Sequence, residues 1–396
     1  MLARVAALLS LIVLLAGCRR QTVVAVGGNE LFALDYGSFE DELDLFALSA
    51  SGTIRTSLTM RDGFFYIANG EAQKIMELNS YGDLLGLYYN DERMKTPPLS
   101  GQEGGAARKA FGYPFNTLGP LAVDSRKNLY VVDTLPTERQ ETDGARRLLL
   151  HQVVLRFASD GTFIDYLGQQ GPGGTPFPFV RGIYTVHGDE LVVICVINDG
   201  LVAYWFGANG FLLYEVPITT VTVPPLEHED DEGDFFVSIE SVIPDTQLRR
   251  LFVKLDYFQT TLDQAVKVAS GVEYSVTLVF PLDVATGRYE KPLEIPPYEE
   301  VAPIRTSGVP YDFLGVTDSG WLFFSVPTER GYQIQMVQAS GSHILKRQLS
   351  VDHGEVLYSS LSLSESGIIS ALFAKRDCAE VVWWRTDLLV APAISK

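Results

Sequence analysis

The feature that most constrains the fold of this chain is a structural unit that recurs along it. In each copy a polar turn leads into an apolar strand, and a hairpin of two strands around a glycine follows. The clearest copy contains Leu121–Asp124, Asn128–Asp133, Val153–Phe157 and Phe163–Gly168. Asn-Gly and Asp-Gly steps tolerate the positive φ that tight hairpins require. Short apolar runs between such turns, without a long stretch of 3.6-residue periodicity, predict an all-β protein.

Six copies of this unit can be counted. The other five are centred on Phe64–Ala68, Glu190–Ile197, Leu251–Leu255, Trp321–Phe324 and Ile368–Ile369. One antiparallel sheet cannot bury both of its faces, so repeated sheets must pack radially, which predicts a six-bladed β-propeller. Seven or eight blades would result if Val23–Val26 and Glu30–Leu34 began a blade of their own. We expect instead that one of these two segments closes the ring by joining the last sheet.

The second unit resembles an NHL repeat. The resemblance rests on Ala122-Val123-Asp124, Asn128–Asp133 and Phe157–Gly161. The whole chain, particularly Ser80–Leu85 and Gly171–Pro178, is also similar to a family of uncharacterised spirochaetal lipoproteins with NHL-like propellers. This resemblance carries no known catalytic residues. The chain departs from a compact NHL repeat by two long inserts, Leu135–Leu150 and Thr219–Asp234.

The N-terminus has the pattern of a bacterial secretory signal. Arg4 precedes the apolar run Val5–Leu15, which ends in Leu15-Ala16-Gly17-Cys18. A membrane-spanning helix needs roughly 20 apolar residues, so this run is short for a span. The last four residues resemble the lipobox of bacterial lipoproteins, which implies diacylglycerol on the Cys18 thiol, cleavage after Gly17 and a further acyl chain on the new amine. The alternative is an ordinary signal peptide or a transmembrane helix that ends in cysteine.

These patterns predict three segments: a signal peptide over residues 1–17, a lipidated tether over 18–21 and a single propeller domain over 22–390. The predicted location is the bacterial cell envelope, with attachment to a membrane through Cys18. Removing the signal peptide takes away one cation, Arg4, and changes the formal charge from -18 to -19. A protein with this much net negative charge repels nucleic acid and anionic lipid headgroups. We therefore expect no nucleic-acid partner and no membrane attachment through a basic patch.

Enzymatic motifs are absent from the sequence. It contains no HExxH, GxSxG, Walker loop or CxxC spacing, and a buried, inert thiol is the simplest interpretation of Cys195. The glycine-rich segment 168–174 favours a loop between blades over a phosphate site. The acidic run Glu227–Asp234 favours a solvated loop, with weak Ca²⁺ binding or a basic partner as alternatives. The insert Leu135–Leu150 predicts a surface hairpin or loop.

Isolated histidines and tryptophans point to structural roles. The histidines, which show no metal-binding spacing, are His151, His187, His228, His343 and His353. The tryptophans, which fall inside strands and are expected to pack between blades, are Trp205, Trp321, Trp383 and Trp384.

We therefore expect no catalytic, cofactor-binding or metal-binding residue, and a membrane-anchored platform that binds protein or envelope partners. The alternative is a metal-dependent hydrolase or lactonase that holds a divalent cation on the propeller axis. Its candidate ligands are polar residues at strand ends, and all of them also suit ordinary turns: Asn69, Asp124, Asp133, Asn198 and Asp318.

Overall fold

The computed structural model describes residues 23–45, 54–94, 109–226, 235–262, 269–301 and 306–390. Cys18, the predicted signal peptide and tether, and the acidic run Glu227–Asp234 lie outside the described residues. Within these ranges no helix is long and apolar enough to cross a membrane.

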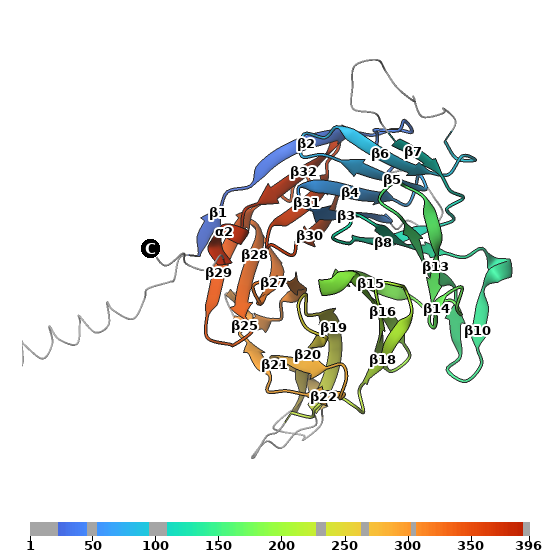
Figure 1. The fold of residues 1–396 in the computed structure, drawn as a ribbon. Helices are drawn as coiled ribbons and strands as arrows, with labels where there is room; N and C mark the ends of the chain where they lie inside the picture. Colours follow the sequence, from blue (N-terminus) through green and yellow to red (C-terminus); the bar gives the residue numbers. More distant parts are fainter. Residues whose placement is uncertain are drawn as a thin grey trace, which may run out of the picture.

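Six sheets are arranged in a ring around a central axis (Figure 1). We number these blades in chain order. Blade 1 contains β3 (Thr56–Arg61), β4 (Phe64–Asn69), β5 (Lys74–Leu78), β6 (Leu84–Tyr89) and β7 (Lys109–Gly112). Blade 2 contains β8 (Leu118–Val123), β9 (Leu129–Thr134), β12 (Gln152–Phe157), β13 (Phe163–Gly168) and β14 (Gly171–Pro172). Blade 3 contains β15 (Val180–Val186), β16 (Glu190–Ile197), β17 (Gly200–Phe206) and β18 (Leu212–Thr219).

The second half of the ring is built in the same way. Blade 4 contains β19 (Phe235–Pro244), β20 (Arg250–Leu262), β21 (Ala269–Asp283), β22 (Arg288–Tyr289) and β23 (Leu293–Ile295). Blade 5 contains β26 (Asp312–Val316), β27 (Trp321–Thr328), β28 (Gly331–Gln338), β29 (Ile344–Ser350) and β1 (Val24–Val26). Blade 6 contains β30 (Tyr358–Leu363), β31 (Ile369–Ala374), β32 (Cys378–Trp384) and β2 (Asn29–Asp35). The predicted six-bladed propeller is confirmed.

The ring closes through the N-terminal strand β2. It pairs antiparallel with β32 of the last blade, from Asn29 opposite Trp383 to Asp35 opposite Cys378. The expectation that an N-terminal strand joins the last sheet is therefore confirmed. The preceding strand β1 pairs in parallel with β29 of blade 5 instead, so the N-terminal strands bind two different blades. Closure leaves the first and last blades as ordinary neighbours and removes an exposed sheet edge.

The hydrophobic core is divided into six clusters, and each cluster lies between two neighbouring blades. Strand β9 shows why. Val131 packs toward blade 1 while its neighbours Tyr130 and Val132 pack toward blade 3, because successive side chains point to opposite faces of a sheet. Both faces of a blade are buried, which explains the nearly continuous apolar runs in the sequence. Burying each large aliphatic side chain contributes about 1.5–3 kcal/mol, so the blade interfaces supply most of the stability.

The outer hairpin turns use the glycines that the sequence pattern singled out. Gly82, Gly161, Gly210, Gly287 and Gly341 all have positive φ. Gly161 is constrained twice, since its φ is 87° and a Cβ there would lie 2.0 Å from the Phe111 ring of blade 1.

Candidate functional site

The two faces of the ring differ in their connections. The innermost strands are β3, β8, β15, β19, β26 and β30, and their ends meet at one face, which we call the turn face. Strands alternate in direction within each blade, so the hairpins between the first and second strands and between the third and fourth strands lie at this face. Each of these hairpin connections has no more than five residues. The opposite face, where the innermost strands begin, is called the insert face.

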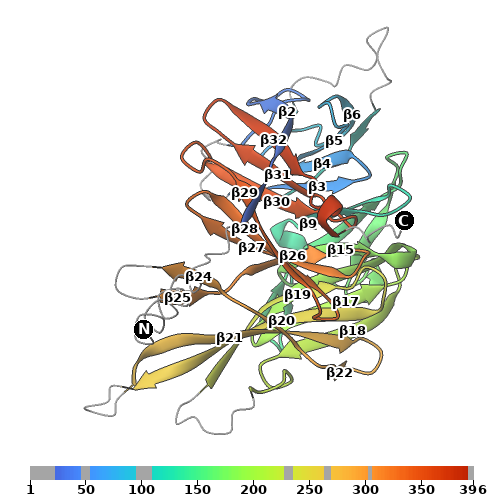
Figure 2. The ribbon, with the colours of Figure 1, turned by 90° about the vertical axis from the view of Figure 1, so that its left-hand side faces the viewer.

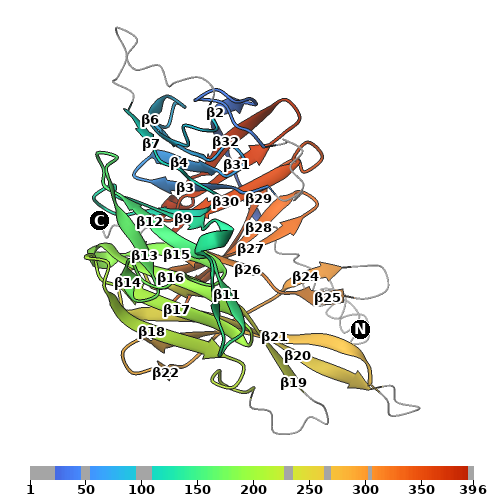
Figure 3. The same ribbon diagram turned by 90° about the vertical axis from the view of Figure 1, so that its right-hand side faces the viewer.

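Every connection longer than five residues between the blade strands leaves from the insert face, and all but one also return there. The exception is residues 90–108, because β7 pairs in parallel with β6 and therefore begins toward the turn face. The connections of more than twelve residues are 36–55, 90–108, 135–151, 220–234 and 296–311. Figures 2 and 3 show the elongated β20–β21 hairpin and the hairpin of β24 (Tyr298–Val301) and β25 (Thr306–Val309) projecting from the same side of the ring. Long connections on a rigid scaffold are where proteins most often place binding residues.

The insert 135–150 forms an ordered hairpin beside blade 3, which confirms the prediction of a surface hairpin. It consists of a short 3-10 helix (Thr137–Arg139), β10 (Glu141–Asp143) and β11 (Leu148–Leu150). Asn198 of blade 3 donates from Nδ2 to the carbonyl oxygen of Arg146, at 2.6 Å. The Arg146 guanidinium lies 3.5 Å from a Glu215 carboxylate oxygen. The tip of the hairpin is thus held, although most of its residues are exposed.

A cavity of about 350 Å³ separates this hairpin from the glycine-rich loop. Arg139 and Glu141 line one side, and Tyr166 and residues 173–176 line the other. The Arg139 guanidinium lies 5.9 Å from the centre of the Tyr166 ring. Across the same loop, a Cβ on Gly171 would lie 3.0 Å from the carbonyl oxygen of Gly210 in blade 3. The glycine-rich segment is partly strand, because Gly168 ends β13 and Gly171-Pro172 form β14 of blade 2. The expected loop between blades begins only at residue 173, from which the chain leads to blade 3.

The second predicted insert is described only as far as residue 226. Its first turn is anchored, because Val223 is buried and the Tyr257 hydroxyl donates to the carbonyl oxygen of Pro224 at 2.7 Å. Val221, in contrast, is 86% exposed. This insert therefore leaves blade 3 from a fixed base at the insert face.

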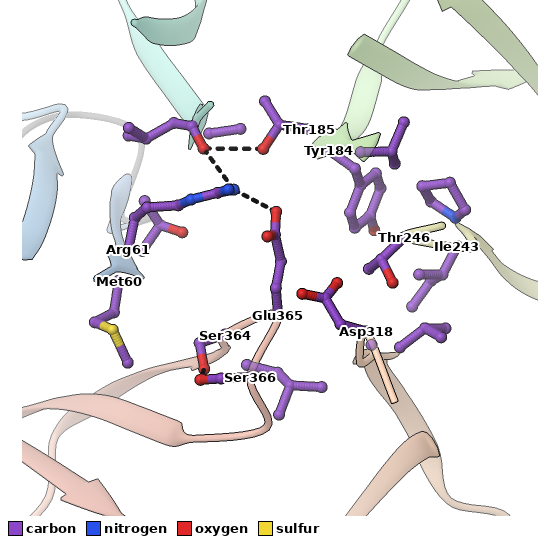
Figure 4. Close-up of a pocket in the computed structure, with 18 of the residues that line it drawn as sticks. Met60, Arg61, Tyr184, Thr185, Ile243, Thr246, Asp318, Ser364, Glu365 and Ser366 are labelled. Atoms are coloured by element: carbon purple, nitrogen blue, oxygen red, sulfur yellow. Dashed lines mark hydrogen bonds and ion pairs between the residues drawn. The ribbon is translucent and has the colours of Figure 1, made fainter. Parts of the chain in front are cut away.

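An axial cavity of about 210 Å³ lies at the turn face, and all six innermost strands contribute to it (Figure 4). Its apolar wall includes Leu121, Ile183, Ile243, Val316 and Leu363. Most of its polar groups come from the hairpin turns that follow the innermost strands, namely Asp62, Thr246, Asp318, Ser364, Glu365 and Ser366, and Arg61 is the last residue of β3.

These polar groups link the blades to one another, beginning with Arg61. Arg61 Nη1 of blade 1 donates to Oε1 of Glu365 in blade 6 and, at 3.3 Å, to the carbonyl oxygen of Val123 in blade 2. The Thr185 hydroxyl of blade 3 donates to the same Val123 oxygen at 2.9 Å. Figure 4 shows these contacts converging on the cavity wall.

The remaining blade interfaces are bridged in the same way. The backbone N–H of His187 in blade 3 donates to the carbonyl oxygen of Thr246 in blade 4 at 2.8 Å. Gln247 Nε2 of blade 4 donates to Asp318 Oδ1 of blade 5 at 3.0 Å. The backbone N–H of Asp318 donates to the carbonyl oxygen of Glu365 at 2.9 Å. Together with the Arg61 contacts, these bonds form a continuous hydrogen-bonded ring around the axis.

The pKa values of two carboxyl groups at the turn face are shifted in opposite directions. Burial raises the pKa of Glu365, which the Arg61 guanidinium opposes and the nearby Asp318 carboxylate reinforces. Burial also acts to raise the pKa of Asp189, but hydrogen bonds from the Ser125 hydroxyl and backbone N–H outweigh it and lower that pKa.

The structure does not bring the five candidate axial ligands together. Asp124 and Asp318 follow innermost strands, at the turn face. Asn69, Asp133 and Asn198 end or follow second strands, at the insert face: Asn69 pairs with Thr56 and Asp133 with Leu118, at the starts of innermost strands. Five residue steps along a strand span roughly 17 Å, so the two groups cannot share one ion.

Four of these candidates stabilise local structure. Asp124 Oδ1 accepts backbone hydrogen bonds from Arg126 and Asn128 within its own turn, at 2.9 and 2.8 Å. Asn69 Nδ2 donates to the carbonyl oxygen of Asp44 at 2.7 Å. Asn198, as described above, holds the β10–β11 hairpin.

Asp133 is buried and accepts hydrogen bonds from the backbone N–H groups of Asn116 and Thr117. Burial raises the pKa of Asp133 to about 6, although these hydrogen bonds act to lower it. Asp133 thereby fixes the segment that enters blade 2. Across the described ranges, no three His, Cys, Asp or Glu side chains are grouped so that they could hold a metal ion.

The remaining singled-out residues have structural roles. Cys195 is buried and unpaired, and burial raises the pKa of its thiol, which disfavours the reactive thiolate. Trp205 and Trp384 are fully buried in clusters between blades, and Trp321 and Trp383 pack against such clusters, as predicted.

The sequence interpretation missed most residues of the axial ring. Thr246 and Glu365 stand in turns of different composition, Arg61 is the last residue of a strand, and only Asp318 was selected. Aligning the six units at the ends of their first strands would have shown that each turn supplies a polar group at the same place.

Comparisons with known proteins do not assign an activity to this chain. No protein-family model matches the chain, and no curated protein matches it. Among solved structures, a gluconolactonase from Xanthomonas campestris is similar at 10% identity, over 91% of this chain and 96% of the other, with a TM-score of 0.40. The Dos1 propeller is similar at 10% identity, over 91% and 95%, with a TM-score of 0.41. An inactive virginiamycin B lyase from Staphylococcus aureus, solved with quinupristin, is similar at 10% identity, over 92% and 96%, with a TM-score of 0.38. Likenesses this weak carry no argument about function, and the fold assignment rests on the strand pairing.

Proposed function

We propose that this chain is a lipid-anchored propeller that binds a protein or envelope partner through its insert face. The observation that carries this proposal is that every long connection leaves from the insert face and all but residues 90–108 return to it, while the hairpins of the turn face stay short. The propeller topology itself places the connections between blades at this face. Residues 135–151, however, join two adjacent strands of blade 2, where a hairpin of about two to five residues would suffice. Such an insert on a rigid scaffold is where proteins most often place binding residues.

The β10–β11 hairpin is a structured part of this surface that contacts blade 3. Glu138, Arg139 and Leu149 are exposed, with Leu149 51% exposed. Contacts to Asn198 and Glu215 hold the hairpin in place before any partner binds. A preorganised hairpin loses little conformational entropy on binding, which favours affinity.

The axial cavity supports a structural role for most of its polar groups. Catalysis requires a base or nucleophile held near a reacting atom. Arg61, Asp318 and Glu365 are instead engaged across blade interfaces. We therefore favour binding over the alternative of a hydrolase or lactonase.

The proposed lipid anchor determines how the hairpin is oriented relative to the membrane. Cys18 precedes the first described residue, Val23, by five residues, which can span at most roughly 17 Å. Strand β1 lies on the outer edge of blade 5, while β10–β11 lies on the opposite side of the ring (Figure 1). An anchor at Cys18 would hold blade 5 near the membrane and direct the hairpin away from it.

The anchor is tested by the mass and partitioning of the mature protein. We expect a mature chain that begins at Cys18 and carries three acyl chains, and a Cys18→Ala variant that leaves the membrane fraction. A Cys18→Ala variant that still partitions fully with membranes would rule out lipid attachment at this residue.

The docking surface is tested by shortening the hairpin. The Leu135 N–H donates to the carbonyl oxygen of His151 at 2.7 Å, and the register of β9 and β12 places these two residues opposite each other. A two-residue Asn-Gly link can therefore replace residues 136–150 without moving the strands. We expect unchanged thermal unfolding and loss of the crosslinked partner recovered from native membranes. The control is Tyr81→Ala, which changes an 82% exposed side chain at the turn face. Unchanged capture, together with carboxylate-dependent ester or lactone hydrolysis, would favour the enzyme.

A further inference from the structure

We propose that the axial cavity at the turn face binds a small organic cation, a primary amine with a short aliphatic body. This ligand site is separate from the insert face and does not depend on partner docking. The cavity is bounded by the ends of all six innermost strands, so its shape is fixed by the ring and not by a mobile loop (Figure 4).

The charge of the cavity favours a cation. Among its lining residues, Asp62, Asp318 and Glu365 are acidic and Arg61 is the one cation. Arg61 pairs with Glu365. The Asp318 carboxylate accepts a hydrogen bond from the neutral side-chain amide of Gln247 and forms no ion pair with any described residue. An anionic ligand would add to this excess of negative charge, whereas an ammonium group would neutralise part of it.

A second, independent observation points to a hydrogen-bond donor at the same place. Thr246 is only 8% exposed, and its hydroxyl oxygen has no hydrogen-bond partner. Figure 4 places this side chain beside Asp318 and the Tyr184 ring, on the wall of the cavity. Buried hydroxyl groups in folded proteins are almost always paired, so an orphaned one indicates a missing group.

An ammonium group fits these neighbours. It carries three donors, which can reach the Asp318 carboxylate, the Thr246 hydroxyl and the Glu365 carboxylate. The adjacent Tyr184 ring also attracts a cation. A metal ion fits less well, because the described residues offer no group of three acidic, histidine or cysteine ligands.

The walls determine the rest of the ligand. Leu121, Ile183, Ile243, Val316 and Leu363 present aliphatic side chains around the polar end. Transfer of methylene groups from water onto such a surface is favourable. The volume of about 210 Å³ admits several non-hydrogen atoms, which matches an alkylamine with a short chain.

The test is calorimetric titration of the full-length mature protein in detergent with n-butylamine and 1,4-diaminobutane, and with butanoate as the anionic counterpart. We expect saturable binding of the amines and none of butanoate. Asp318→Asn and Thr246→Val should each weaken amine binding by about tenfold. Asp83→Asn, which makes the same charge change in an exposed turn at the same face, should leave binding unchanged.

Thr246→Val keeps the test valid if Asp318→Asn disturbs the fold. The blade contact of Thr246 uses its backbone carbonyl, so valine removes the orphaned hydroxyl and leaves that contact in place. Absence of amine binding, equal binding of butanoate, or full amine affinity in the Thr246→Val variant would each overturn the proposal.

Discussion

Arg61 and Glu365 are 304 residues apart in the chain, and their side chains form an ion pair that joins blade 1 to blade 6. The pair lies beside the axis, with 17% and 29% of the two side chains exposed. Arg61 also bonds to blade 2, so a single guanidinium connects three consecutive blades. At the turn face, Arg61 therefore joins the first, second and last blades, beside the contact of the Lys127 ammonium with the Phe64 ring between blades 1 and 2.

Removal of this guanidinium should destabilise the whole ring. We expect Arg61→Met to lower the free energy of unfolding by about 2 kcal/mol, because Glu365 keeps its partly buried charge without a partner. Glu365→Gln should lower the free energy of unfolding by a smaller amount. The double variant should lose less of this free energy than the sum of the losses in the two single variants. Urea unfolding of the four proteins measures this coupling. Strictly additive losses would show that the two residues stabilise the ring independently.

Deletion of the last strand should abolish folding. Strand β32 pairs with β31 on one side and with β2 on the other, and its Ala379, Val381 and Trp384 are buried. A chain ending at residue 377 would leave β2 unpaired and two blade interfaces open. We expect insoluble expression of this truncation, while a chain ending at residue 390 should remain soluble. Cooperative unfolding of a soluble chain ending at 377 would contradict closure through β2.

Stability should rise on acidification through the titration of Asp133. Its pKa is raised to about 6 by burial, against about 3.9 in an unfolded chain. Between these values the folded state binds more protons than the unfolded state, so the free energy of unfolding increases as the pH falls from about 6 to about 4. Two pKa units correspond to about 3 kcal/mol, an order-of-magnitude figure for this buried group.

Asp133→Asn should remove this contribution. We expect the difference in unfolding free energy between pH 4.5 and pH 7 to be smaller in the variant than in the natural chain, in urea titrations at both values. Asp352→Asn, in an exposed turn, serves as the control. An identical pH dependence in Asp133→Asn and the natural chain would show that Asp133 does not titrate in this range.

The architecture could be predicted because its determinants are local. Turn residues such as Gly161 and Gly210, and apolar runs such as Leu191–Ile197, each act within a few residues of chain. Their repetition implied radial packing, and the six clusters between blades confirm it. The pairing of β1 with blade 5 was not predicted, since nothing in Val24–Val26 distinguishes one outer edge from another.

The axial cavity could not be predicted in the same way. Its polar groups come from strand ends and turns of different blades that are at least 46 residues apart in the chain, the smallest separation being that of Asp318 and Ser364. Their contacts depend on the position of each turn around the axis. Residue type at strand ends selected Asp124, Asp133 and Asp318 without regard to strand direction. The alternation of strand direction would already have placed Asp133 at the opposite face from the other two. Arg61, as the last residue of a strand, gave no signal that it faces the axis.

The central claim is that the insert face docks a partner. A photoreactive residue placed at Leu149 on the hairpin, and separately at Tyr81 on the turn face, tests it in intact cells. Both side chains are exposed, at 51% and 82% respectively. The account predicts one discrete adduct from the Leu149 position, which excess unlabelled protein competes away, and none from Tyr81. Adducts of equal yield and identity from both positions, or adducts at Tyr81 alone, would contradict it.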